Sequence, residues 1–264
     1  VWPAFMLRRP AFLRARARII ELGQKVLDFH RQNPPEASGR LPDLIDDILA
    51  NVRPDGRDFT EDDLLSMSIG PYFAGMDTVA SSISFFVYTL LKHPDALAQV
   101  QAEADALFAS DTLEMQALRQ MDALHAAAIE ALRLFPVTPF TPRTAVEQIE
   151  FGGYRIDPGT EVMIAQTVTH MLPEYYPDPQ RYDITRHMGA KSSTPPGVFA
   201  PFTLGAHTCL GAGLAEAQMM LTIAALVHTV DLELESPDYV VPVKTMPLPN
   251  PGNQFRMRVV RQRN

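Results

Sequence analysis

Hydrophobic periodicity divides the chain into helical stretches separated by segments rich in proline and glycine. Residues 9–32 carry apolar side chains at positions 12, 13, 19, 20, 22, 26, 27 and 29, which is helical spacing with a basic opposite face. The prolines at 34 and 35 end this helix, because a residue before proline disfavours helical backbone angles. A short helix is predicted at 43–50, and a capping box between Thr60 and Asp63 opens a long helix that we place at 60–92.

The second half of the chain mixes helices with short strands. Further helices are predicted to begin at His93-Pro94, at Asp122 and after Gly213, each with apolar residues at helical spacing. Residues 144–164 alternate apolar and polar positions around two glycine-containing turns, which predicts a hairpin. Strands with proline-rich turns are predicted from 229 to 261.

The only cysteine, Cys209, lies between Gly205 and Gly211, just before the predicted helix that follows Gly213. Glycine permits unusual backbone angles and close approach, and the start of a helix favours a thiolate over a neutral thiol. A lone free cysteine is usually a small buried hydrophobe. The two glycines, His207 two positions earlier and the helix start favour a metal ligand or a nucleophile instead.

Composition narrows the function classes. The 264 residues carry a net charge of −8, which argues against a nucleic-acid-binding surface. One cysteine excludes a disulfide framework and fits a reducing compartment. The longest apolar stretch, around 83–91, is too short to predict a transmembrane helix, and the basic face of 9–32 is interpreted as a solvated helix face and not as a membrane surface.

The cysteine segment resembles the haem-binding signature of the cytochrome P-450 superfamily, Phe-x-x-Gly-x-His/Arg-x-Cys-x-Gly, which are haem-thiolate monooxygenases. Phe202, Gly205, His207, Cys209 and Gly211 match it, and Thr203 departs from the Gly or Ser more often found there. Residues 74–78 (Ala-Gly-Met-Asp-Thr) resemble the family motif on the long helix that crosses the distal face of the haem. The two motifs occur in family order, and the resemblance covers nearly the whole chain, from about residue 9 to the end.

The resemblance implies a mainly α fold with small β-sheets, in one haem-thiolate monooxygenase domain over residues 1–264 that lacks its N-terminal part. Because the cysteine segment of the family lies near the C-terminus, we expect this chain to be roughly the C-terminal two-thirds of such a protein, of bacterial type. The implied cofactor is haem b, with Cys209 as the iron ligand and Asp77 and Thr78 relaying protons to dioxygen. The implied haem contacts are Ala74, Gly75, Arg143, Phe202, Gly205, His207, Leu210 and Gly211, with Arg143 and His207 near the propionates.

A third resemblance concerns folding and haem-site architecture. Glu130 and Arg133 lie three residues apart on one helical face with apolar flanks, so the pair is expected to be buried. In the family this pair forms a charge network with an arginine from a later segment of the chain. Pro179-Gln180-Arg181-Tyr182 resembles that segment, and it predicts Arg181 as the third charge.

The implied reaction is insertion of one oxygen atom of dioxygen into an apolar small molecule. The visible walls of the implied substrate pocket are Phe73, Val137 and Phe140. Electrons would come from a ferredoxin or a flavoprotein reductase, because the sequence shows no flavin or iron–sulfur motif. Two alternatives stay open: a peroxygenase or rearrangement enzyme of the same fold, which the Asp77-Thr78 pair argues against, and a truncated haem-binding fragment without activity. We expect a cytoplasmic protein without a nucleic-acid partner and without membrane contact in this part.

Overall fold

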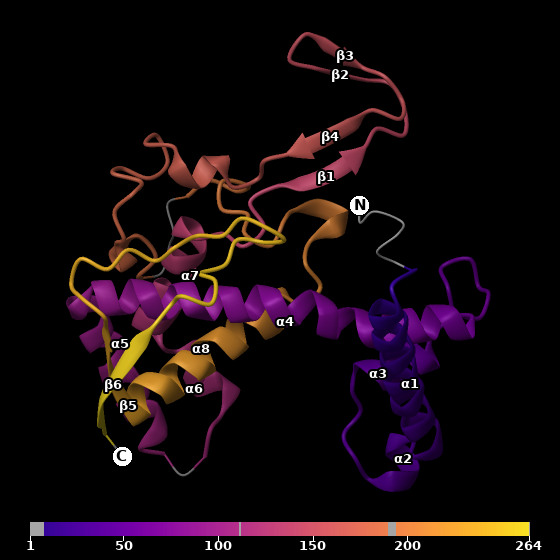
Figure 1. Cartoon of the computed structure of the whole chain (residues 1–264), viewed down its shortest axis with the longest axis horizontal. Coiled ribbons are helices and arrows are strands. Elements are labelled where there is room, and N and C mark those ends of the chain that lie inside the picture. Colours follow the sequence, from indigo (N-terminus) through magenta and orange to yellow (C-terminus); the bar gives the residue numbers. More distant parts are fainter. Residues whose placement is uncertain (1–7, 111, 190–193, 264) are drawn as a thin grey trace. The chain divides into compact units, whose positions relative to one another are not determined.

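The computed structural model describes residues 8–110, 112–189 and 194–263. The predicted order of helices and small sheets is confirmed (Figure 1). The helices are α1 (Pro10–Gln32), α2 (Pro35–Ser38), α3 (Leu44–Ala50), α4 (Glu61–Lys92), α5 (Pro94–Phe108), α6 (Met115–Arg119), α7 (Asp122–Leu134) and α8 (Ala212–Thr229). The strands are β1 (Thr141–Thr144), β2 (Ile149–Phe151), β3 (Tyr154–Ile156), β4 (Glu161–Ile164), β5 (Val230–Leu234) and β6 (Met257–Gln262).

Two compact units are formed, and they divide inside α4: the first ends at Met76 and the second begins at Asp77. The first unit has a small core of Leu27, Ile45, Ile48 and Leu64. The predicted capping box starts α4, since the Thr60 amide donates to Asp63 at 3.0 Å and the Asp63 amide donates to Thr60 Oγ1 at 3.2 Å.

The core of the second unit joins α4, α5, α7 and α8. Phe86 and Leu90 from α4 pack with Val100 from α5 and Ile223 from α8, and all four are at most 1% exposed. In the same core, α7 buries five alanines, whose small side chains allow close helix packing. By length and composition α4 is also the one described helix that could span a membrane, and 44% of its most apolar window is buried inside the protein.

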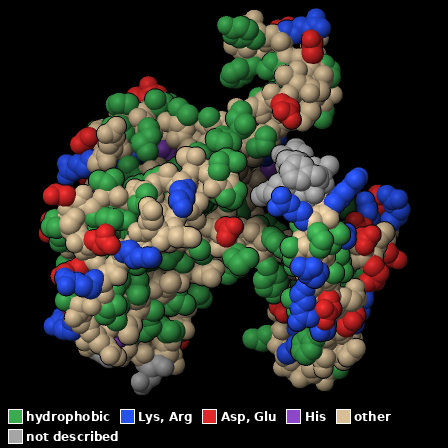
Figure 2. Space-filling model, in the orientation of Figure 1, with side chains coloured by type: hydrophobic (Ala, Val, Ile, Leu, Met, Phe, Trp, Pro, Cys, Tyr) green, Lys and Arg blue, Asp and Glu red, His purple; other side chains and the backbone are tan. Residues whose placement is uncertain are grey.

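The described residues form three sheets, and each sheet has two antiparallel strands. The predicted hairpin forms two successive pairs, β1 with β4 and β2 with β3, which Figure 1 shows as one extended ribbon. Phe151 and Tyr154 are each 77% exposed, and Figure 2 shows hydrophobic side chains on the surface of this ribbon. Near the C-terminus only β5 and β6 pair as strands; the proline-rich segment between them is mostly irregular, apart from one bridge between Lys244 and Asn250.

A side chain from α5 completes the start of α7. Residue Met121 precedes α7 without a side-chain cap, and the Glu103 carboxylate instead accepts hydrogen bonds from the amides of Ala123 at 2.9 Å and Leu124 at 2.8 Å. These amides would otherwise lack partners, and a negative charge at a helix N-terminus is favourable. Glu103 therefore links two helices of the core.

We expect Glu103→Ala to lower the free energy of unfolding by about 1–2 kcal/mol, because two capping hydrogen bonds to the start of α7 are lost. Urea unfolding followed by circular dichroism measures this. Glu150→Ala, on the exposed strand β2, is the matched control and should change stability by less than about 0.5 kcal/mol. Equal effects of the two substitutions would contradict the capping role.

Candidate functional site

The cysteine segment forms a closed loop in front of α8. The Cys209 amide donates to the Phe202 carbonyl at 2.9 Å, which ties the two ends of the loop together. Between them lies the short 3₁₀ helix η4 (Gly205–His207). Gly211 precedes α8, and its carbonyl accepts the first intrahelical bond from Ala215 at 2.8 Å. The sequence therefore places Cys209 one turn before a long helix, as predicted.

The Cys209 side chain is exposed and is a free thiol. Gly205 has φ +75°, a conformation that side chains rarely adopt, so glycine is required for the turn. At Gly211 an added Cβ would lie 4.0 Å from Cys209 Sγ, which is an ordinary van der Waals contact, so the backbone there passes close to the sulfur. Apolar side chains next to the cysteine are also exposed: Leu204 is 56%, Leu210 is 91% and Leu214 is 73% exposed. A soft sulfur ligand is thus presented among apolar groups.

The predicted propionate contacts lie on separate elements. Arg143 is half-buried on β1, where it is the register partner of Val162, and its guanidinium donates to the Pro142 carbonyl at 2.9 Å. His207 is exposed at the end of η4. Phe202 is half-buried and packs against the core of the second unit. Phe202 thus anchors the loop, and His207 is free to face a bound group.

The helix motif at 74–78 lies inside α4, at the boundary of the two units. Ala74 and Asp77 are exposed, while Gly75 and Thr78 are half-buried. A Cβ at Gly75 would meet no atom within 4 Å, so local packing does not require glycine there. The open space at Gly75 and the exposed Asp77 carboxylate are compatible with a ligand passing close to this turn of the helix.

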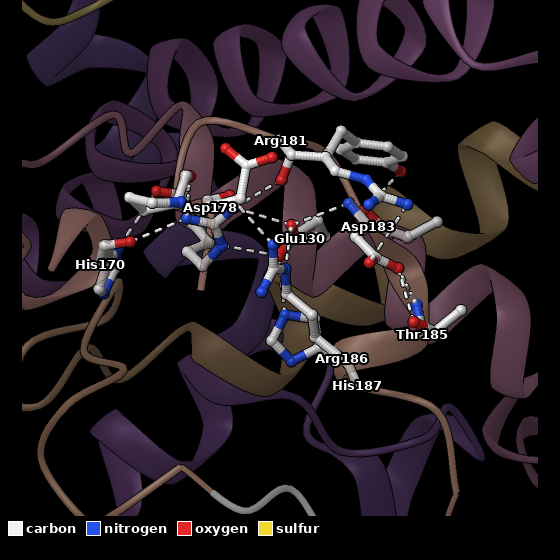
Figure 3. A network of polar contacts seen from close by, with 12 residues as sticks. Glu130, His170, Asp178, Arg181, Asp183, Thr185, Arg186 and His187 are labelled. Atoms are coloured by element: carbon white, nitrogen blue, oxygen red, sulfur yellow. Dashed lines mark hydrogen bonds and ion pairs between the residues drawn. The ribbon is translucent and has the colours of Figure 1, made fainter. Parts of the chain in front are cut away.

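The predicted ion pair of Glu130 and Arg133 is present and fully buried. Figure 3 shows Glu130 within its network of polar contacts. Arg133 Nε donates to Glu130 Oε2 at 2.7 Å and its Nη2 donates to Oε1 at 2.8 Å, with both side chains 0% exposed. Arg133 also donates to three backbone carbonyls, those of His170, Pro179 and Arg181. Burial alone would raise the pKa of Glu130, but hydrogen bonds from Arg133 and His187 outweigh burial and hold it below its usual range.

The prediction that the Arg181 side chain joins this pair is wrong. Its side chain is 67% exposed and lies 3.8 Å from Asp183, and only its backbone carbonyl contacts Arg133. Arg186 Nε instead lies 3.4 Å from Glu130 Oε1, and His187 Nε2 lies 2.9 Å from Oε2 (Figure 3). The cause is the 3₁₀ helix η3 (Ile184–Arg186), which is capped by Asp183 and turns its last side chain and the next one, that of His187, toward Glu130.

His170, at the end of the 3₁₀-helical segment η2 (Val168–Met171), was not predicted as part of this site. It is 0% exposed, its Nδ1 donates to the Arg133 carbonyl at 3.3 Å, and its Nε2 accepts from the Ala200 amide at 3.1 Å. Burial lowers its pKa to about 4, with the Arg133 guanidinium lowering it further and the Glu130 carboxylate opposing this. The neutral ring therefore connects the ion pair to the segment that enters the cysteine loop.

Comparisons with known proteins give consistent matches over most of the chain. A family model described as Cytochrome P450 matches residues 5–257. The sterol 14alpha-demethylase of Mycolicibacterium vanbaalenii is 32% identical over 227 residues, which cover 84% of this chain and 50% of that protein. Abscisic acid 8'-hydroxylase 3 of Oryza sativa subsp. indica is 34% identical over 203 residues, covering 75% of this chain and 40% of that protein.

Solved structures give the same result. The crystal structure of a cytochrome P450 (CYP102L1) matches with a TM-score of 0.84 and 27% identity, over 97% of this chain and 58% of that chain. Retinoic acid bound cyanobacterial CYP120A1 matches with a TM-score of 0.83 and 27% identity, over 95% and 57% of the two chains. The chain spans about half the length of the curated relatives it matches.

We expect Arg186→Ala to lower the free energy of unfolding by about 2 kcal/mol, because a buried carboxylate loses one of its cations. Arg181→Ala is the matched control, since it removes the same side chain five residues earlier at an exposed position. Arg181→Ala should lower the free energy of unfolding, measured by chemical denaturation, by less than about 0.5 kcal/mol. A larger cost for Arg181→Ala than for Arg186→Ala would restore Arg181 as the third charge.

His170 makes stability depend on pH. Its pKa of about 4 in the folded state lies below the ordinary histidine value of 6.5, so below pH 6.5 the unfolded chain binds a proton that the folded chain does not. His170 therefore destabilises the fold as the pH decreases from about 6.5 to about 4, by up to roughly 3 kcal/mol. Urea unfolding at several pH values across this range should show that the free energy of unfolding decreases less in His170→Gln than in the parent chain. Parallel curves of free energy against pH for the two proteins would contradict this assignment.

Proposed function

The chain belongs to the cytochrome P450 family, and on this basis we propose that it carries the haem-binding part of a monooxygenase. The proposed reaction inserts one atom of dioxygen into an apolar organic substrate, with electrons from a separate redox partner. The observation that carries the proposal is the exposed Cys209 sulfur, held on a closed loop immediately before α8. We also propose that residues 1–264 belong to one such domain, because the family model spans both compact units.

The residues present fit a haem. Cys209 offers a soft anionic ligand, Gly205 allows the left-handed turn of its loop, and Leu210 and Leu214 offer exposed apolar contacts to a flat apolar ring. Arg143 and His207 are suited to carboxylate groups at the edge of such a ring. When bound, haem b supplies the iron on which dioxygen is reduced and its O–O bond cleaved.

The chain's own residues would supply the sulfur ligand of the haem and deliver protons to dioxygen. The Cys209 thiolate would donate electron density through its sulfur, while the loop hydrogen bonds hold that sulfur in place. The exposed Asp77 carboxylate can take up a proton from solvent, and the neighbouring Thr78 hydroxyl can pass it on through Oγ1. This pair favours a monooxygenase over a peroxygenase or rearrangement enzyme, which needs no such relay.

Substrate and partners are proposed by chemical class only. Val137 is half-buried and Phe140 is 49% exposed, and both precede β1, so they offer apolar contacts to a small molecule. Phe73, on α4 in the first unit, is 56% exposed, and its role as a substrate contact rests on the family resemblance alone. We propose a ferredoxin or flavoprotein reductase as the electron donor and a cytoplasmic location, with the single cysteine in keeping with a reducing compartment.

The test is the carbon-monoxide difference spectrum of the dithionite-reduced chain after loading with haem. We expect the strongly red-shifted Soret band of a thiolate-ligated haem, and we expect Cys209→Ala to abolish it because the sulfur ligand is lost. Glu150→Ala, a surface change on β2, should keep the band. An unshifted band, no haem uptake, or a red-shifted band in Cys209→Ala would overturn the proposal for this chain.

A further inference from the structure

Thr203 adopts a backbone conformation that its side chain disfavours. Its φ is +60°, in the left-handed region, and among the described residues Asp178 is the one other non-glycine with positive φ. For a β-branched residue this conformation is an outlier that costs free energy. Such strain persists only where surrounding contacts hold it in place, and it concentrates at functional sites.

Two hydrogen bonds hold Thr203 in this conformation. Its amide donates to the Ala200 carbonyl at 3.3 Å, and its hydroxyl donates to the His207 carbonyl at 2.6 Å. The second bond spans the loop from the entering arm to the arm that leads to Cys209. It lies next to the bond between the Cys209 amide and the Phe202 carbonyl, so the two bonds form adjacent rungs across the loop.

The entering arm is itself fixed from the core. The Ala200 amide donates to buried His170, whose backbone carbonyl accepts from Arg133. Hydrogen bonds therefore connect the buried ion pair, through His170 and Ala200, to Thr203 and then to the arm carrying the cysteine. In this path the hydrogen bond from the Thr203 hydroxyl to the His207 carbonyl is the step in which a side chain crosses the loop.

We propose that Thr203 is a positioning residue for Cys209. Its hydroxyl holds the His207 carbonyl and so keeps the loop closed at the Cys209 amide, in spite of the unfavourable φ. Without the hydroxyl, Thr203 relaxes toward negative φ and the loop opens. The effect on haem ligation rests on the proposed function of Cys209, whereas the effect on loop closure does not.

The first test measures loop closure in the haem-free chain. Hydrogen exchange of the Cys209 amide reports its hydrogen bond to the Phe202 carbonyl. The rate at which iodoacetamide alkylates the single thiol reports the accessibility and reactivity of the sulfur. Thr203→Val keeps the shape of the side chain and removes the hydroxyl. We expect about a fivefold loss of amide protection, as for one lost hydrogen bond, and an altered alkylation rate. Thr203→Ser keeps the hydroxyl and should stay within about twofold of the parent.

Thr208→Val is the matched control within the same loop. The Thr208 hydroxyl donates to the Gly205 carbonyl at 2.8 Å, but the Thr208 amide donates to the same carbonyl at 3.1 Å, so that link survives the substitution. Protection of the Cys209 amide should stay within about twofold of the parent. Equal protection in Thr203→Val and the parent, or equal losses in Thr203→Val and Thr208→Val, would overturn the proposal.

The second test uses the haem-loaded chain and a spectroscopic signature. In Thr203→Val the red-shifted carbon-monoxide band should lose intensity to the unshifted band, and Thr203→Ser should restore it. If Thr203→Val keeps the full red-shifted band, the positioning role is overturned. If the parent chain itself lacks the band, the proposed function fails, and the exchange measurements still decide the role of Thr203 in loop closure.

Discussion

The buried pair of Glu130 and Arg133 imposes the strongest constraint on this structure. Two charges removed from water are costly unless every remaining hydrogen-bonding group is satisfied. Arg133 meets this requirement with two bonds to Glu130 and three to backbone carbonyls between residues 170 and 181. A segment with little regular secondary structure is therefore held in one conformation by the charges it covers.

This constraint extends to the candidate site through short, directional contacts. His170 stacks on Phe199 with ring centroids 5.1 Å apart and accepts a hydrogen bond from the next amide, that of Ala200. Phe202 then packs into the core, and the loop closes between Phe202 and Cys209. A rigid scaffold thus positions an exposed sulfur, which is the usual arrangement for ligands carried on loops.

The site could be predicted only in part, and the failures have a common cause. Cys209, Gly205 and the pair of Glu130 and Arg133 were recognised because local spacing defines them. The resemblance of residues 179–182 to a family segment predicts Arg181 as the third charge, but the turn at η3 brings Arg186 and His187 to Glu130 instead. His170 and Glu103 were missed because their partners lie far away along the chain, at Ala200 and at the start of α7.

The sequence by itself determined the main helices, the capping box of α4, the paired hairpin and the position of the cysteine before a helix, because periodicity, capping residues and glycine turns act over a few neighbouring residues. The tertiary structure alone decided which charges meet Glu130, that Glu103 caps a helix from another element, and that Thr203 takes a left-handed conformation. These features depend on contacts between residues distant in the chain, where burial makes satisfaction of each polar group obligatory.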